Sequence, residues 1–63
     1  MRDVWEAMSD KTRREILVML KERNLSAGEI AEKFSLTKAT VSHHLSVLRQ
    51  AGLVDTEKRA QTV

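Results

Sequence analysis

The chain has 63 residues, of which 41% are hydrophobic and 32% charged, and its formal net charge is +2. A chain of this length allows one small domain with a marginal core, and the absence of cysteine excludes disulfide staples and thiolate metal sites. No apolar run reaches the roughly 18 residues of a membrane span and the N-terminus lacks a signal-peptide pattern, so we expect a cytoplasmic protein with a single domain over residues 1–63.

The charge is unevenly distributed along the chain. Residues 1–36 hold seven Lys or Arg and seven Asp or Glu, so the whole positive excess lies after residue 36. No acidic residue stands between Glu32 and Asp55, whereas Lys38 and Arg49 do. A segment without acids does not repel phosphate, which favours contact with nucleic acid, although so short a gap also arises by chance.

Two helices are predicted in the N-terminal third of the chain. The first is short and has Val4, Trp5 and Met8 on one face. Asp10 can cap the second, which is expected over residues 11–23, with Asn24 as a stop signal. The buried stripe of the second helix is expected to consist of Ile16, Leu17 and Leu20.

A third helix is predicted after Ser26. Ser26 and Glu29 have the S-x-x-E spacing of a capping box, which marks the first turn of a helix. Ser35 and Leu36 then turn a corner into the next helix. The residues expected to be buried in the third helix are Ile30 and Phe34, with Ala31 as the small residue where a neighbouring helix comes close.

The fourth helix has two contrasting sides. It is expected to begin after the cap residue Thr37 and to end near Ala51, where Gly52 tolerates the left-handed conformation. At about 100° per residue, one side is mainly apolar, and the opposite side is small and polar. The apolar side has Val41, His44, Leu45 and Leu48, and the polar side has Ala39, Ser42, His43, Ser46 and Gln50.

The small polar side is typical of a helix that enters the major groove of DNA. Such a helix needs short side chains for close approach and donors or acceptors for base edges, whereas a plain solvated helix carries Glu and Lys. The segment of residues 26–51 is therefore predicted to be a DNA-binding helix-turn-helix. The expected DNA contacts are Thr37, Lys38, Ala39, Thr40, Ser42, His43, Ser46 and Arg49.

A short β-hairpin is predicted over residues 53–63. Leu53 and Val54 begin it, and a polar run separates them from Thr62 at its far end. A basic tip formed by Lys58 and Arg59 would reach a phosphate or the minor groove. The alternative is a frayed, charged tail.

Three blocks of sequence resemble one protein family. They are TRR-x-IL at Thr12–Leu17, S-x-x-EIA at Ser26–Ala31 and VSHHL-x-VL-x-x-AGLV at Val41–Val54. Together they resemble the winged-helix core of the ArsR-type bacterial transcriptional repressors. The resemblance implies a mostly α winged helix-turn-helix with four helices and a short hairpin wing, which binds an operator in double-stranded DNA as a homodimeric repressor.

Members of this family usually continue through a second wing strand and a C-terminal helix that pairs with the N-terminal helix to form the dimer. We expect this chain to be a truncated form, with a homodimer in the intact protein and a monomer or weak dimer here. Trp5 is then either a core residue or an exposed part of the dimer interface. The expected interface residues are Val4, Trp5, Met8 and Val18.

Two inward-facing polar residues have expected structural roles. Arg13 lies on the side of Ile16 and Leu20, which predicts a buried stem with a hydrogen-bonded head. His44 lies on the inward side of the fourth helix, where a hydrogen-bonded role is expected. His43 faces outward, and its protonation below about pH 6.5 would strengthen DNA binding.

The same residues argue against other functions. Metal-responsive members of the family carry cysteines in the third helix, and residues 27–34 have none. His43 and His44 point about 100° apart and cannot hold one ion together, so we expect no metal and no cofactor. No nucleophile and base lie within reach, so we expect no enzyme. The alternative is a winged-helix protein-interaction domain, which would favour apolar anchors on the outward side of the fourth helix.

Overall fold

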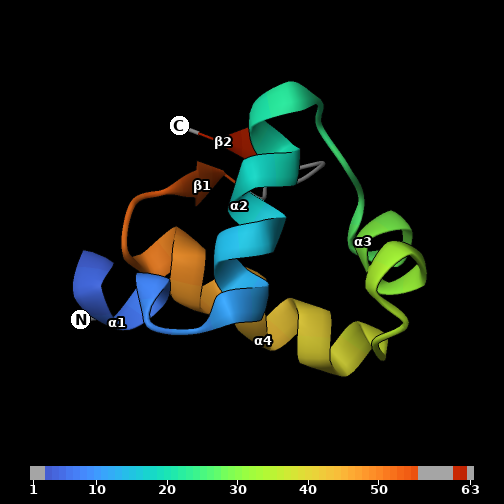
Figure 1. Cartoon of the computed structure of the whole chain (residues 1–63), viewed down its shortest axis with the longest axis horizontal. Coiled ribbons are helices and arrows are strands. Elements are labelled where there is room, and N and C mark those ends of the chain that lie inside the picture. The colour runs from blue at the N-terminus through green and yellow to red at the C-terminus, as the bar shows by residue number, and fades with distance from the viewer. Residues whose placement is uncertain (1–2, 56–60, 63) are drawn as a thin grey trace.

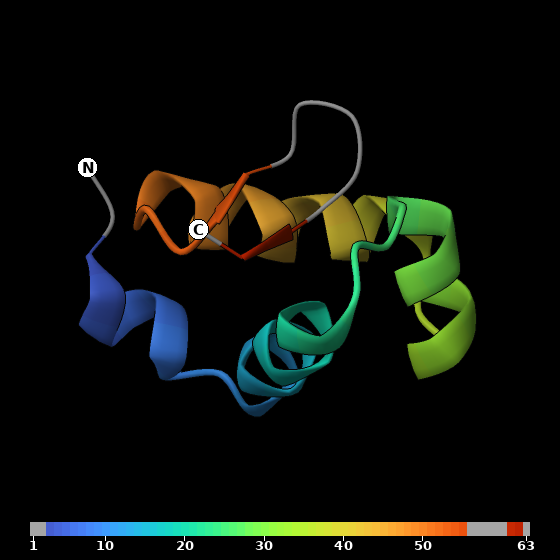
Figure 2. The same ribbon diagram turned by 90° about the horizontal axis from the view of Figure 1, so that it is seen from above.

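A computed structural model describes residues 3–55 and 61–62 of the chain. Helix α4 runs along the length of the molecule, α2 crosses it, and α1 and α3 lie towards opposite ends of α4 (Figures 1 and 2). No helix within the described residues is long and apolar enough to cross a membrane. The elements in chain order are α1 (Val4–Met8), α2 (Lys11–Glu22), α3 (Ala27–Phe34), α4 (Lys38–Gln50), β1 (Val54–Asp55) and β2 (Gln61–Thr62).

Each helix begins at a residue whose side chain accepts a backbone N–H bond. Asp10 caps α2, as predicted, and accepts from the backbone N–H of Arg13 at 2.9 Å. Thr37 caps α4, also as predicted, and accepts from the backbone N–H of Thr40 at 3.2 Å. The predicted capping box of α3 is present in both directions, with Ser26 N–H donating to Glu29 Oε1 at 2.9 Å and Glu29 N–H donating to Ser26 Oγ at 3.1 Å. Asp3 caps α1, which was not predicted. Such caps contribute about 1 kcal/mol each.

Left-handed residues mark two helix ends. Gly52 follows α4 with φ 78°, as predicted, and Ala51 is the C-cap residue. Ser35 ends α3 with φ 55°, a conformation that was not expected of a serine. The N–H of Leu36 then donates to the carbonyl of Ala31 at 2.9 Å and closes the corner between α3 and α4.

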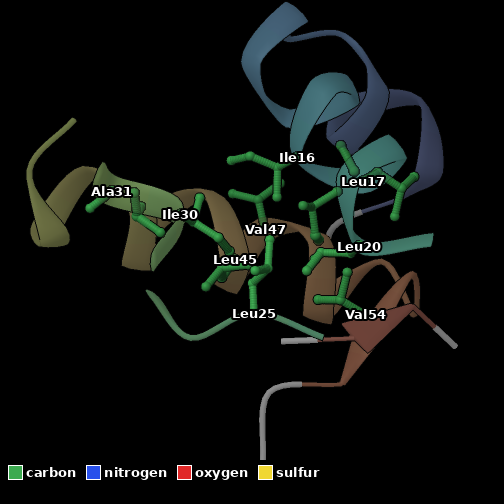
Figure 3. Close-up of a cluster of buried hydrophobic side chains, with 12 residues drawn as sticks. Ile16, Leu17, Leu20, Leu25, Ile30, Ala31, Leu45, Val47 and Val54 are labelled. Carbon is green, nitrogen blue, oxygen red and sulfur yellow. The ribbon is translucent and has the colours of Figure 1, made fainter. Parts of the chain in front are cut away.

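The core lies where α2, α3 and α4 meet (Figure 3). The predicted stripe of α2 is buried, as are Ile30 and Ala31 of α3. The prediction that Phe34 is buried was wrong in degree, because this last residue of α3 packs against the core but stays partly exposed. The sequence analysis missed three residues that are at most 1% exposed, namely Ala7, Leu25 and Val47.

A short antiparallel hairpin follows α4. Val54 pairs with Thr62 and Asp55 pairs with Gln61, so the hairpin prediction is confirmed and the alternative of a frayed tail is wrong for these residues. Val54 is only 2% exposed and anchors β1 to the core. Strand β2 contacts α2. The predicted basic tip, Lys58 and Arg59, lies outside the described residues.

Candidate nucleic-acid interface

Helix α4 separates its core residues from its polar residues. Val41, Leu45 and Leu48 are buried, and the opposite side faces solvent, as the helical angles predicted. We name this opposite side the reading face. It consists of Ala39, Ser42, His43 and Gln50, which are exposed, and Ser46, which is half-buried.

The first turn of α4 presents a pair of hydroxyl groups. The Thr37 hydroxyl accepts from the backbone N–H of Thr40 and donates to the Thr40 hydroxyl at 2.9 Å. The proton of the Thr37 hydroxyl is therefore used within the helix, while the proton of the Thr40 hydroxyl can donate outward. Of the two predicted contacts, Thr40 is the better donor to a phosphate oxygen.

Lys38 extends from α4 over the first turn of α3. A Cβ atom added to Gly28 would lie 3.5 Å from Lys38 Cε and 4.0 Å from Lys38 Nζ. The ammonium group therefore lies beside the N-terminal turn of α3, whose amide dipoles are also positive. The sequence analysis found Lys38 but not its neighbour Gly28, because their proximity depends on how α3 packs against α4.

In the C-terminal half of the reading face, two side chains are joined by a hydrogen bond. Gln50 Nε2 donates to Ser46 Oγ at 3.3 Å, which holds the two side chains along the helix. Arg49 is exposed and lies seven residues after Ser42, so both lie on nearly the same stripe of α4. The predicted contacts from Thr37 to Arg49 thus belong to one helix and its cap, and all but half-buried Ser46 are exposed.

The two adjacent histidines have different surroundings. Their ring centroids are 5.9 Å apart, with 51° between the ring planes. His43 is exposed on the reading face, and His44 is half-buried with its Nδ1 atom 3.4 Å from Arg13 Nη1. The predicted inward, hydrogen-bonded position of His44 is confirmed.

Burial lowers the pKa of His44 below its ordinary value of 6.5. The positive charge of Arg13 and the neighbouring His43 also lower this pKa, whereas the carboxylate of Asp10 opposes them. His44 is therefore neutral at pH 7, and its Nδ1 atom can accept a hydrogen bond from Arg13.

Arg13 links α1 and α2 through its head group. Its Nε atom donates to the Ala7 carbonyl at 2.9 Å, and its Nη2 atom donates to the Glu6 carbonyl at 3.0 Å. The side chain is partly buried, which confirms the predicted hydrogen-bonded head. Across residues 3–55 and 61–62, no group of three or more His, Cys, Asp or Glu residues is placed to hold a metal ion.

The residues predicted for a dimer interface are largely exposed. Trp5 is 86% exposed, so its alternative role as a core residue is wrong. Val18 is 61% and Val4 48% exposed, and Met8 is half-buried. Val18 also lines a shallow hollow of about 390 Å³ on α2, with Lys11, Arg14 and Glu15.

Comparison with known proteins gives consistent matches. The sequence model of the family described as bacterial regulatory protein, arsR family, matches residues 10–56. The transcriptional repressor SdpR of Bacillus subtilis is 43% identical over 63 residues, which are 100% of this chain and 70% of SdpR. The transcriptional activator HlyU of Vibrio cholerae is 45% identical over 58 residues, which are 92% of this chain and 54% of HlyU.

Solved structures match over a similar range. One structure of HlyU from Vibrio cholerae has a TM-score of 0.86 and 34% identity, and the match covers 94% of this chain and 70% of that one. An ArsR-like transcriptional regulator from Rhodococcus sp. RHA1 also has a TM-score of 0.86, with 31% identity, and the match covers 95% of this chain and 60% of that one. These neighbours therefore share the fold described above over most of this chain.

Proposed function

Because the chain belongs to the arsR family of bacterial regulatory proteins, we propose that it represses transcription by binding an inverted-repeat operator as a dimer. It is a DNA-binding transcriptional regulator with a winged helix-turn-helix. Repression, as opposed to activation, is part of what we propose, because SdpR is named a repressor and HlyU an activator. The site of action would be the cytoplasm, where bacterial DNA lies.

The observation that carries this proposal is the reading face of α4. Its side chains are short and polar, and none of its residues is acidic. Close approach of a helix to base edges needs this combination. The face also lacks the aromatic or large aliphatic anchors that a protein partner would use, so it supports DNA over the protein-interaction alternative.

We assign two kinds of contact to the interface. Lys38 and Thr40, at the N-terminal end of α4, would hold the phosphate backbone and fix the register of the helix. Ser42 and His43 would reach base edges in the major groove. The hydrogen-bonded side chains of Ser46 and Gln50 follow them along the helix. Arg49 would contact a phosphate at the far end of the helix.

Dimer formation would supply the second half-site. A two-fold symmetric dimer presents two reading helices and therefore matches an inverted repeat. The exposed side chains of Val4, Trp5 and Val18, together with half-buried Met8, support an association surface on α1 and α2. Trp5 is the strongest anchor in this set, because a tryptophan carries a large apolar area at low entropic cost.

The test is a titration of labelled DNA followed by fluorescence anisotropy. The probe is an inverted-repeat duplex selected by the chain from a randomised pool, and the control is the same duplex with scrambled sequence. We expect tighter binding to the repeat and a steep loss of affinity as salt rises. Sedimentation of the same sample gives the oligomeric state.

Lys38→Gln makes the test specific to the proposed site. Loss of one phosphate contact should lower affinity for all duplexes about equally and reduce the slope of log K against log salt by about 1. Lys33→Gln, an exposed cation of α3 outside the proposed site, is the matched control and should leave the slope unchanged. Absence of DNA binding by a sample shown to be dimeric would contradict the proposal and favour the protein-interaction alternative.

A further inference from the structure

Side chains of α2 hold the C-terminal end of helix α1. Helix α1 has five residues, and so short a helix is unstable alone because nucleation is costly. At its C-terminal end, the Glu6 carbonyl accepts hydrogen bonds from the backbone N–H and the hydroxyl of Ser9, at 3.2 and 2.7 Å. Arg13 of α2 supplies donors to the Glu6 and Ala7 carbonyls at 3.0 and 2.9 Å, and Arg14 supplies one to Met8 at 2.8 Å.

The third nitrogen of the Arg13 guanidinium points to a different helix. Arg13 Nη1 lies 3.4 Å from Nδ1 of His44, in the middle of α4. A guanidinium is planar and rigid, so its three nitrogens cannot move independently. One group thus fixes the end of α1 and the position of His44 at the same time.

His44 adjoins the reading face. It follows His43 directly and Ser42 by two residues on a continuous helix. The side chains of a helix turn together when the helix rotates about its axis, because the backbone hydrogen bonds keep their angles fixed. A shift at His44 therefore changes how Ser42 and His43 are presented to DNA.

We propose that Arg13 is a positioning residue for DNA recognition, which sets the rotation of α4 by joining His44 to the carbonyl end of α1. This inference rests on the proposed DNA-reading role of α4. Its consequence is that, when α1 is displaced, for example by a second copy that docks on Trp5, the movement is transmitted to the reading face through the Arg13 guanidinium.

Arg14 provides a matched control for Arg13. It is the next residue of the same helix, has the same side chain, and also donates to a carbonyl of α1. Among the described residues it makes no hydrogen bond to α4. Arg14→Lys therefore weakens the hold on α1 without touching His44, whereas Arg13→Lys keeps the charge but removes the planar fork that reaches both helices.

The experiment compares Arg13→Lys and Arg14→Lys in the 63-residue chain by amide NMR and by affinity for the inverted-repeat duplex. We expect Arg13→Lys to move the amide signals of Ser42, His43 and Ser46 and to weaken binding about 5- to 10-fold. The salt slope should not change, because Arg13 makes no phosphate contact in the proposed complex. Arg14→Lys should leave the α4 signals and the affinity as they are.

Two results would overturn the inference. One is an Arg13→Lys chain whose α4 signals stay in place, and the other is an equal shift in Arg14→Lys. The amide signals are recorded without DNA, so they decide the role of Arg13 even if the wild-type chain binds no DNA. That last outcome would contradict the proposed function and with it the role of Arg13 in DNA recognition, whereas the amide signals would still decide whether Arg13 sets the position of α4.

Changes at His44 test the same contact from the other side if Arg13→Lys fails to fold. His44→Asn keeps an acceptor near the position of Nδ1, and His44→Leu removes it. We expect His44→Leu to move the signals of Thr40 and Gln50 and to weaken DNA binding, and His44→Asn to restore both towards wild type. Equal behaviour of the two folded variants would contradict the positioning role.

Discussion

His43 and His44 show how much a rotation of about 100° changes the chemistry of one residue type. His43 is exposed on the reading face, and His44 is half-buried against Arg13. The helical angle alone predicted which of the two points inward. It could not predict the partner of His44, because Arg13 lies 31 residues away and the contact depends on how α2 crosses α4.

His44 makes the stability of the fold dependent on pH. Its folded pKa lies below 6.5, so the folded chain takes up this proton less readily than the unfolded chain. The contribution to stability is complete above pH 6.5 and is lost as pH falls through the lowered pKa. We expect urea denaturation to show a falling free energy of unfolding between about pH 7 and 5, and a smaller fall in His44→Asn.

Asp10 titrates in a separate, more acidic range. The backbone N–H of Arg13 holds the pKa of Asp10 below 3.8, so its contribution is present above that pH and is lost in stronger acid. Measurements above about pH 5 therefore exclude the contribution of Asp10. An equal pH dependence in wild type and His44→Asn would show that another group is responsible.

At the scale of the helices, the residues that begin α2, α3 and α4 were predictable, whereas the N-cap of α1 and the left-handed residue that ends α3 were not. Asp10, Ser26 and Thr37 act through a bond to a backbone N–H only three residues ahead, so the sequence alone contains both partners. Ser35 adopts φ 55° although serine has no preference for it. The packing of α3 against α4 imposes that corner.

We expect substitutions at the two left-handed positions to change the free energy of unfolding in opposite directions. Gly52 has φ 78° and open space around a Cβ atom, so Gly52→Ala should cost about 1 kcal/mol through backbone strain alone. Ser35→Gly relieves such strain but gives the unfolded chain more freedom, and should raise stability by less than about 1 kcal/mol. Urea denaturation measures both changes. A neutral Gly52→Ala would show that the turn relaxes to another conformation.

At the scale of the whole molecule, core residues were predictable where they share one stripe of a helix, as Ile16, Leu17 and Leu20 of α2 do. The buried stripe of α2 followed from the helical period of its apolar residues, but the burial of Val47 did not follow from the helical period of α4. Helix α4 contacts α1, α2, α3 and β1, so its buried arc is wider than a single stripe. Leu25 and Ala7 sit outside any long periodic segment, and their burial depends on elements distant in sequence.

The exposure of Trp5 leads to a prediction about association. Trp5→Ser should weaken self-association of the chain, measured by sedimentation, and should change the free energy of unfolding by less than about 0.5 kcal/mol because the indole is 86% exposed. In the wild type, tryptophan fluorescence should shift to the blue as concentration rises. A constant spectrum across a measured dimerisation would show that Trp5 lies outside the interface.

The division of α4 into buried and exposed positions also bears on how such a regulator can be retargeted. No large apolar side chain of the core stands on the reading face, so positions such as Ser42, His43 and Gln50 can be exchanged with little effect on packing. Surface substitutions of this kind usually alter stability by about 0.5 kcal/mol or less. A library that varies only these positions should therefore yield mostly folded proteins, from which new operator preferences can be selected.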